Sequence, residues 1–101
     1  FISFYIVPSS VNDCPEYDSY TAAYLYYYFA KPSKLTDLCR AAMCVAHHQY
    51  GADVINCLDI LENKKILESL RFVDGDGHLN YYFYNFGYPE VPPEQCGVVL
   101  L

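Results

Sequence analysis

The feature that most restricts the fold is a tyrosine-rich segment near the N-terminus. Residues 20–29 contain five tyrosines and one phenylalanine. Aromatic side chains at this density favour an extended strand over a helix, despite the two alanines at 22 and 23. Because side chains alternate between the two faces of a strand, Tyr24 and Tyr26 share one face and Tyr27 belongs to the other.

Patterns elsewhere predict both strands and helices. Apolar and aromatic runs predict further strands over 1–7, 54–58, 79–86 and 97–101. Apolar residues at helical spacing predict a long helix that opens at Ser33 and stops at Gly51, and a shorter helix over 63–70. Residues 74–77, Asp-Gly-Asp-Gly, predict a turn. The order ββαβαββ indicates a mixed α/β sheet.

Composition narrows the classes of function. The 101 residues, 53% hydrophobic and 18% charged, describe one globular domain. A net charge of −6 argues against nucleic-acid binding and favours a cationic or neutral partner. The longest apolar run, residues 22–30, is far shorter than the roughly 20 residues that a membrane-spanning helix needs. We therefore predict no transmembrane segment.

The cysteines and the first residue bear on the cellular context. Five cysteines cannot all pair internally, which favours reduced thiols in a cytoplasmic protein over a secreted disulfide domain. The first residue is Phe1 rather than Met, and it lies inside an apolar run that carries no signal for secretion. The sequence therefore begins as if cut within a strand. We therefore expect the chain to be a piece of a longer protein.

Three side chains on the long predicted helix are candidate metal ligands. Cys44, His47 and His48 are spaced i, i+3 and i+4, so they converge on one side of a helix. A zinc site normally has a fourth ligand or a tighter pair, and we predict no metal here. The acidic turn lacks the full calcium-loop pattern, so Asp74 and Asp76 are expected to shape the turn, with one of them meeting a basic or hydroxyl-bearing ligand. The tyrosines either line a ligand groove or pack the sheet, and the pattern leaves both open.

The C-terminus is unusual because an apolar segment ends on the last residue. A terminal carboxylate held in a dry pocket has a raised pKa, as a general base working near neutrality requires. The alternative is a terminal strand that only completes the sheet.

Taken together, these segments resemble the C-terminal region of the eukaryotic N-myristoyltransferases. The resemblance runs nearly end to end, and the order and spacing of its motifs make it specific. The matching residues are Ser3-Phe4-Tyr5, Pro8-Ser9, Ala22-Ala23-Tyr24, Asp53-Val54, Asn56, Leu58-Asp59, Glu62-Asn63-Lys64, Gly75-Asp76-Gly77, Tyr81-Tyr82, Tyr84-Asn85 and Gly97-Val98-Val99-Leu100-Leu101.

The resemblance implies a fold and an activity. Residues 1–101 are expected to form the C-terminal, peptide-binding portion of a two-lobed, acetyltransferase-like (GNAT-type) α/β fold, with a mixed sheet and two helices. The reaction it implies is transfer of myristate from myristoyl-CoA to an N-terminal glycine. Myristoyl-CoA is expected to bind to an N-terminal half outside these residues, so this segment is expected to bind no cofactor.

The resemblance also implies site residues. The α-carboxylate of Leu101 is expected to be the catalytic base, and Asp76 and Gly77 to contact the peptide beyond its glycine. Groove-lining positions fall on Ser9, Tyr24 and Asn56. The expected partners are glycine-initiated peptides and the N-terminal half of the same enzyme. The alternative function is a non-catalytic peptide-binding module of the same fold.

Overall fold

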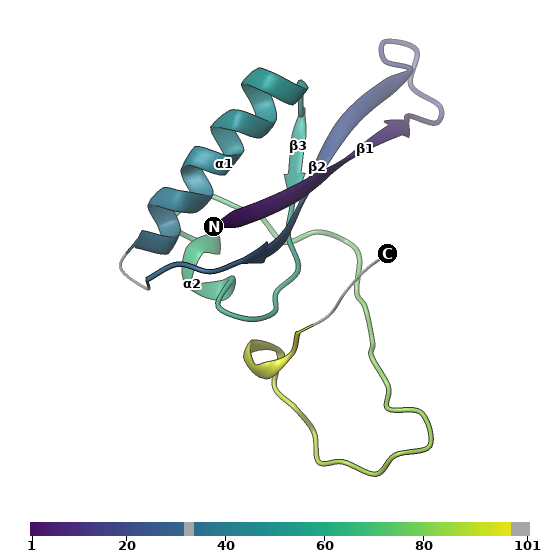
Figure 1. Cartoon of the computed structure of the whole chain (residues 1–101). Helices are drawn as coiled ribbons and strands as arrows, with labels where there is room; N and C mark the ends of the chain where they lie inside the picture. The colour runs from purple at the N-terminus through teal and green to yellow at the C-terminus, as the bar shows by residue number, and fades with distance from the viewer. Residues whose placement is uncertain (32–33, 98–101) are drawn as a thin grey trace. The chain divides into compact units, whose positions relative to one another are not determined.

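The computed structural model describes residues 1–31 and 34–97 of the chain. The chain divides into two compact units, Phe1–Leu58 and Asp59–Leu101 (Figure 1). Within the part of the chain that the structure describes, no helix has the length and apolar character needed to cross a membrane.

A three-stranded mixed sheet forms much of the first unit. β1 (Ile2–Ser10) pairs antiparallel with β2 (Ser19–Tyr28), and β2 pairs parallel with β3 (Val54–Asn56). The three strands predicted in this part of the chain are therefore confirmed, with shifted ends. β1 continues through Pro8 to Ser10, and it tolerates the proline because it is an edge strand in the order β1-β2-β3.

One long helix, α1 (Leu35–Tyr50), connects β2 to β3. Parallel neighbours need such a crossover, because a tight turn can join only antiparallel strands. The helix ends at Gly51, whose left-handed φ of 67° lets its N–H reach the carbonyl groups of Ala46 and His47. The predicted helix and its stop are confirmed, and its predicted opening at Ser33 lies outside the described residues.

The core of the first unit lies between α1 and one face of the sheet (Figure 1). Ala23 of β2, Ala46 of α1 and Ala52 of the loop before β3 are buried together. Such small side chains let the helix backbone approach the sheet closely. The larger side chains packed around them are Phe4, Ile6 and Ile55.

The start of β3 is held to β2 by a reciprocal pair of hydrogen bonds. The Asp53 N–H donates to the Thr21 carbonyl, and the Thr21 N–H donates to Asp53 Oδ2, both at 2.8 Å. This side chain aligns β3 with β2, so Asn56 becomes the partner of Tyr24.

Over residues 59–97, the second unit contains a short helix, α2 (Lys64–Leu67), and a turn of 3-10 helix, η2 (Pro93–Gln95). α2 is shorter than the helix predicted over 63–70, although the Leu70 N–H still bonds the Ile66 carbonyl at 3.0 Å. Arg71 then takes a left-handed φ of 60°, and the Phe72 N–H bonds the Leu67 carbonyl. This geometry ends the helical winding without the usual glycine.

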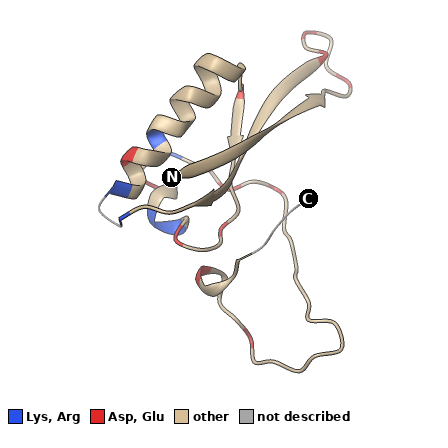
Figure 2. Ribbon diagram, viewed as in Figure 1, with Lys and Arg blue, Asp and Glu red and all other residues tan. Residues whose placement is uncertain are grey.

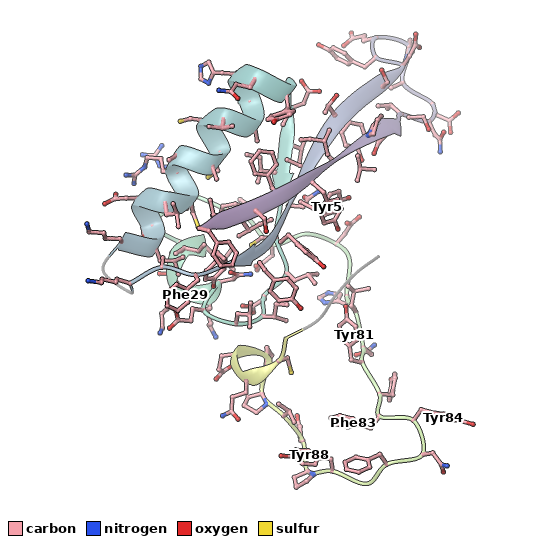
Figure 3. The ribbon with its side chains drawn as sticks, viewed as in Figure 1. Tyr5, Phe29, Tyr81, Phe83, Tyr84 and Tyr88 are labelled. Carbon is pink, nitrogen blue, oxygen red and sulfur yellow. The ribbon has the colours of Figure 1, made fainter. Side chains whose placement is uncertain are left out.

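The strand predicted over 79–86 is wrong for this structure. Residues 79–86 form no strand, and their side chains are exposed, with Tyr82 at 86% and Tyr84 at 95%. Figure 3 labels Tyr81, Phe83 and Tyr84 of this segment. The aromatic pattern is local, whereas a strand also needs a neighbour to hydrogen-bond, and no described residue supplies one. The left-handed Asn85 also turns the backbone away from an extended path. The strand predicted over 97–101 lies outside the described residues except for Gly97, which is in neither helix nor strand.

Candidate functional site

The face of the sheet opposite α1 gathers the candidate site residues of the first unit. On β1, Phe4 contacts Tyr50 of α1 edge-to-face at 5.7 Å, and Ile6 packs on the core cluster. Alternation along the strand therefore directs Tyr5 and Ser9 to the opposite face.

The neighbouring strands continue the same pattern. Ala23 of β2 and Ile55 of β3 face the α1 side, so Tyr24 and Asn56 face the other way. The pairing places Tyr5, Tyr24 and Asn56 in one row across the three strands. We call the surface formed by Tyr5, Ser9, Tyr24, Tyr26 and Asn56 the tyrosine face.

Three predicted groove residues are therefore brought to one surface. Ser9, Tyr24 and Asn56 all lie on the tyrosine face and are partly buried. Ser9 is four residues along β1 from Tyr5, about 13 Å at the rise of a strand. The surface thus offers a hydroxyl, flat rings and an amide over the length of a short extended peptide.

The rings on this face contact one another. Tyr5 stacks on Tyr24 with centroids 5.3 Å apart and planes 10° apart, and it meets Tyr26 edge-to-face at 5.9 Å. Tyr5 (Figure 3) was not predicted as a site residue, although the alternation of β1 is a signal that places it there. Tyr27 falls on the other face by alternation, yet its ring still contacts that of Tyr26 at 4.7 Å.

The strands that carry the tyrosine face have no charged residue. Figure 2 shows β1 and β2 free of Lys, Arg, Asp and Glu along their length. Acidic residues instead occupy the loop between these strands, at Asp13, Glu16 and Asp18. The face itself is therefore suited to apolar and hydrogen-bonding contacts rather than ion pairs.

The other predicted site residues lie elsewhere in the chain. Asp76 and Gly77 belong to the second unit, where both are exposed. Residues 74–77 form neither helix nor strand, and the backbone bends at Asp76. Leu101, the predicted base, lies outside the described residues.

The histidines of α1 are engaged with the backbone. His47 Nδ1 donates to the Ala52 carbonyl at 3.0 Å, and His48 Nδ1 donates to the Cys44 carbonyl at 2.8 Å. Across residues 1–31 and 34–97, no group of three Cys, His, Asp or Glu side chains is placed to hold a metal ion. The two imidazole rings therefore make backbone contacts near the C-terminal end of α1.

The class of protein follows from the sheet, the tyrosine face and the comparison with known families. The chain is a small α/β domain with one sheet face covered by a helix and the other lined by tyrosines. A family model described as the C-terminal domain of myristoyl-CoA:protein N-myristoyltransferase matches residues 1–99. The chain belongs to this family.

Curated relatives agree with the family match. The chain is 45% identical over 100 residues to a glycylpeptide N-tetradecanoyltransferase 2 of Danio rerio, covering 99% of this chain and 20% of the relative. It is 40% identical over 102 residues to a glycylpeptide N-tetradecanoyltransferase 1 of Arabidopsis thaliana, covering 100% of this chain and 23% of the relative. The chain thus spans about a fifth of the length of the relatives it matches.

Proposed function

We propose that this chain is the C-terminal, peptide-binding portion of a glycylpeptide N-tetradecanoyltransferase. Such an enzyme moves myristate from myristoyl-CoA to the N-terminal glycine of a protein. The observation that carries the proposal is the family match over residues 1–99. The odd number of cysteines supports a cytoplasmic location.

The tyrosine face is the proposed floor of the peptide groove. Ser9 and Asn56 offer hydrogen bonds to a peptide backbone, and the ring of Tyr24, the cross-strand neighbour of Asn56, offers an apolar surface. Asp76 and Gly77 are proposed to contact the peptide a few residues beyond its glycine. A carboxylate there and a chain charge of −6 suit a peptide that carries an ammonium group and lysines.

The proposed base is the α-carboxylate of Leu101. It takes one proton from the glycine ammonium, and the neutral amine attacks the thioester carbonyl of myristoyl-CoA. The amide C–N bond forms as the C–S bond breaks, and the coenzyme A thiolate takes up the second proton of the amine. Burial of a carboxylate raises its pKa, which makes the carboxylate basic enough to take the ammonium proton near neutrality.

The rest of the enzyme is the proposed partner of this chain. An N-terminal half would bind myristoyl-CoA, and both halves would share an acetyltransferase-like (GNAT-type) fold. Exposed aromatic residues over 79–86 support such a partner, because this segment has strand-forming side chains and forms no strand by itself.

The test of the base uses the full-length protein that contains this chain. One variant carries a single alanine added after Leu101, and its matched control is Leu101→Ala. The addition moves the carboxylate by one residue, whereas the control changes the side chain and keeps the carboxylate in place. We expect the addition to lower myristoyl transfer to a glycine-initiated peptide by at least about 100-fold, the lower range for losing a positioned base, and the control to remain active.

Peptide binding, measured in parallel, separates the competing functions. Loss of transfer with retained binding in the extended variant supports the carboxylate base. Equal transfer by the extended and unextended proteins would contradict it. Binding without transfer by the unmodified protein would instead identify a non-catalytic recognition module.

A further inference from the structure

The ring of Tyr24 stacks on the ring of Tyr5. Tyr5 is the direct cross-strand partner of Tyr24, and the two rings lie nearly parallel, 5.3 Å apart. Stacked pairs across adjacent strands restrict the rotation of both side chains. The orientation of the Tyr24 ring in the proposed groove therefore depends on Tyr5.

Tyr5 is itself held in place from a second direction. Tyr26 meets it edge-to-face, with centroids 5.9 Å apart and planes 82° apart. Tyr26 and Tyr24 lie two residues apart on the same face of β2, so Tyr5 packs against both. The three rings form one small cluster on the tyrosine face.

This cluster is separate from the core of the first unit. Tyr5 points away from the Ala23, Ala46 and Ala52 cluster and keeps 36% of its surface exposed. A ring that serves only to pack the protein gains the most hydrophobic free energy when it is fully buried. The remaining exposure leaves the cluster accessible from the side on which the proposed groove lies.

We infer that Tyr5 is a positioning residue for peptide binding, because its ring holds Tyr24 in the orientation that receives the peptide. The inference rests on the proposed function and adds to it a residue that does not itself have to touch the peptide. It predicts that peptide binding depends on the stacked ring of Tyr5 and not on its phenol hydroxyl.

The test compares substitutions at Tyr5 in the full-length protein. Tyr5→Leu removes the ring and keeps an apolar side chain, and Tyr5→Phe keeps the ring without its hydroxyl. A matched control is Tyr17→Leu, since Tyr17 is 66% exposed and shows no ring contact among the described residues. The peptide KM and the kcat for transfer from myristoyl-CoA are measured for each variant. The assay temperature is kept below the unfolding transition of the least stable variant.

We expect Tyr5→Leu to raise the peptide KM by about 2- to 10-fold, the range that corresponds to the energy of an aromatic pair. The kcat should stay within about twofold, because the lost contact acts on binding and not on the transition state alone. Tyr5→Phe should restore the KM, and Tyr17→Leu should leave it unchanged. If Tyr5→Leu does not fold, Tyr5→Thr, which suits a partly exposed strand position, replaces it.

A double-mutant cycle shows whether Tyr5 acts through Tyr24. In a Tyr24→Leu background, Tyr5→Leu should change the KM much less than it does alone. Additive effects, an unchanged KM in Tyr5→Leu, or an equal loss in Tyr5→Phe would each overturn the inference. Absence of transfer by the unmodified protein would overturn the proposed function instead, so the two failures are distinguishable.

Discussion

Two cysteines on the same helix show how position on a helix decides the chemistry of a residue. Cys39 faces the core with 3% of its surface exposed, and burial raises the pKa of its thiol. Cys44 lies five residues further along α1 and is exposed. Because the thiolate is the reactive form, the same functional group is protected at one position and available at the other.

We expect iodoacetamide at mildly alkaline pH to modify Cys44 at least about ten times faster than Cys39 in the folded protein. Peptide mapping by mass spectrometry gives both rates, and unfolding in urea should make them similar. Equal rates in the folded state would contradict the burial of Cys39.

The same raised pKa gives a direction for the pH dependence of stability. The buried Cys39 thiol makes its full contribution to the free energy of unfolding at pH values below the pKa of the thiol in the unfolded chain. This contribution is lost as the pH rises through the higher pKa of the thiol in the folded protein. Alkaline conditions therefore destabilise the fold through this group.

At the scale of elements, helix ends decide where the chain turns back to the sheet. α1 ends at Gly51 in the left-handed region, and Ala52 and Asp53 then enter the core and the β2–β3 contact. The end of α2 uses the same left-handed geometry with Arg71, where a side chain makes it less favourable. Only the first of these two ends is marked by glycine in the sequence.

We expect Gly51→Ala to lower the free energy of unfolding by about 1 kcal/mol, because alanine disfavours the left-handed conformation. The cost is conformational alone, since nothing lies within 4 Å of a Cβ added at Gly51. Gly87→Ala is the matched control, as its Cβ would also be unobstructed and Gly87 has no left-handed φ.

Urea unfolding of the chain, followed by far-ultraviolet circular dichroism, measures both variants. Gly51→Asn should lose less than Gly51→Ala, because asparagine tolerates the left-handed region. A similar change for Gly51→Ala and Gly87→Ala would show that the helix end is not the cause.

At the scale of the whole molecule, the chain leaves a large aromatic surface exposed. Phe83, Phe86 and Tyr88 contact one another while remaining exposed. Figure 3 labels Phe83 and Tyr88 of this group. Monomeric soluble proteins rarely expose aromatic side chains in such a group without a partner. This surface is consistent with the proposed burial of the segment in a longer enzyme.

We expect the isolated 101-residue chain to catalyse no myristoyl transfer, because the proposed site for myristoyl-CoA lies in the rest of the enzyme. The purified chain is incubated with myristoyl-CoA and a glycine-initiated peptide, and the acylated product is measured by mass spectrometry. The full-length protein serves as the positive control. Product above the enzyme-free blank would disprove this prediction.

Sequence reasoning located the local elements of the first unit. Tyrosine density indicated β2, helical spacing indicated α1, and Gly51 marked its end. Alternation on β2 also placed Tyr24 and Tyr26 on one face. These features depend on near neighbours in the chain, so the sequence carries them directly.

Sequence by itself determined the family resemblance, the local elements of the first unit and the candidate groove residues. Only the tertiary structure decided that Ser9, Tyr24 and Asn56 share one face, that Tyr5 stacks on Tyr24, and that 79–86 forms no strand. The physical reason is that strand pairing and ring contacts join residues far apart in the chain. A local pattern states what a segment can form, and a distant partner decides whether it forms.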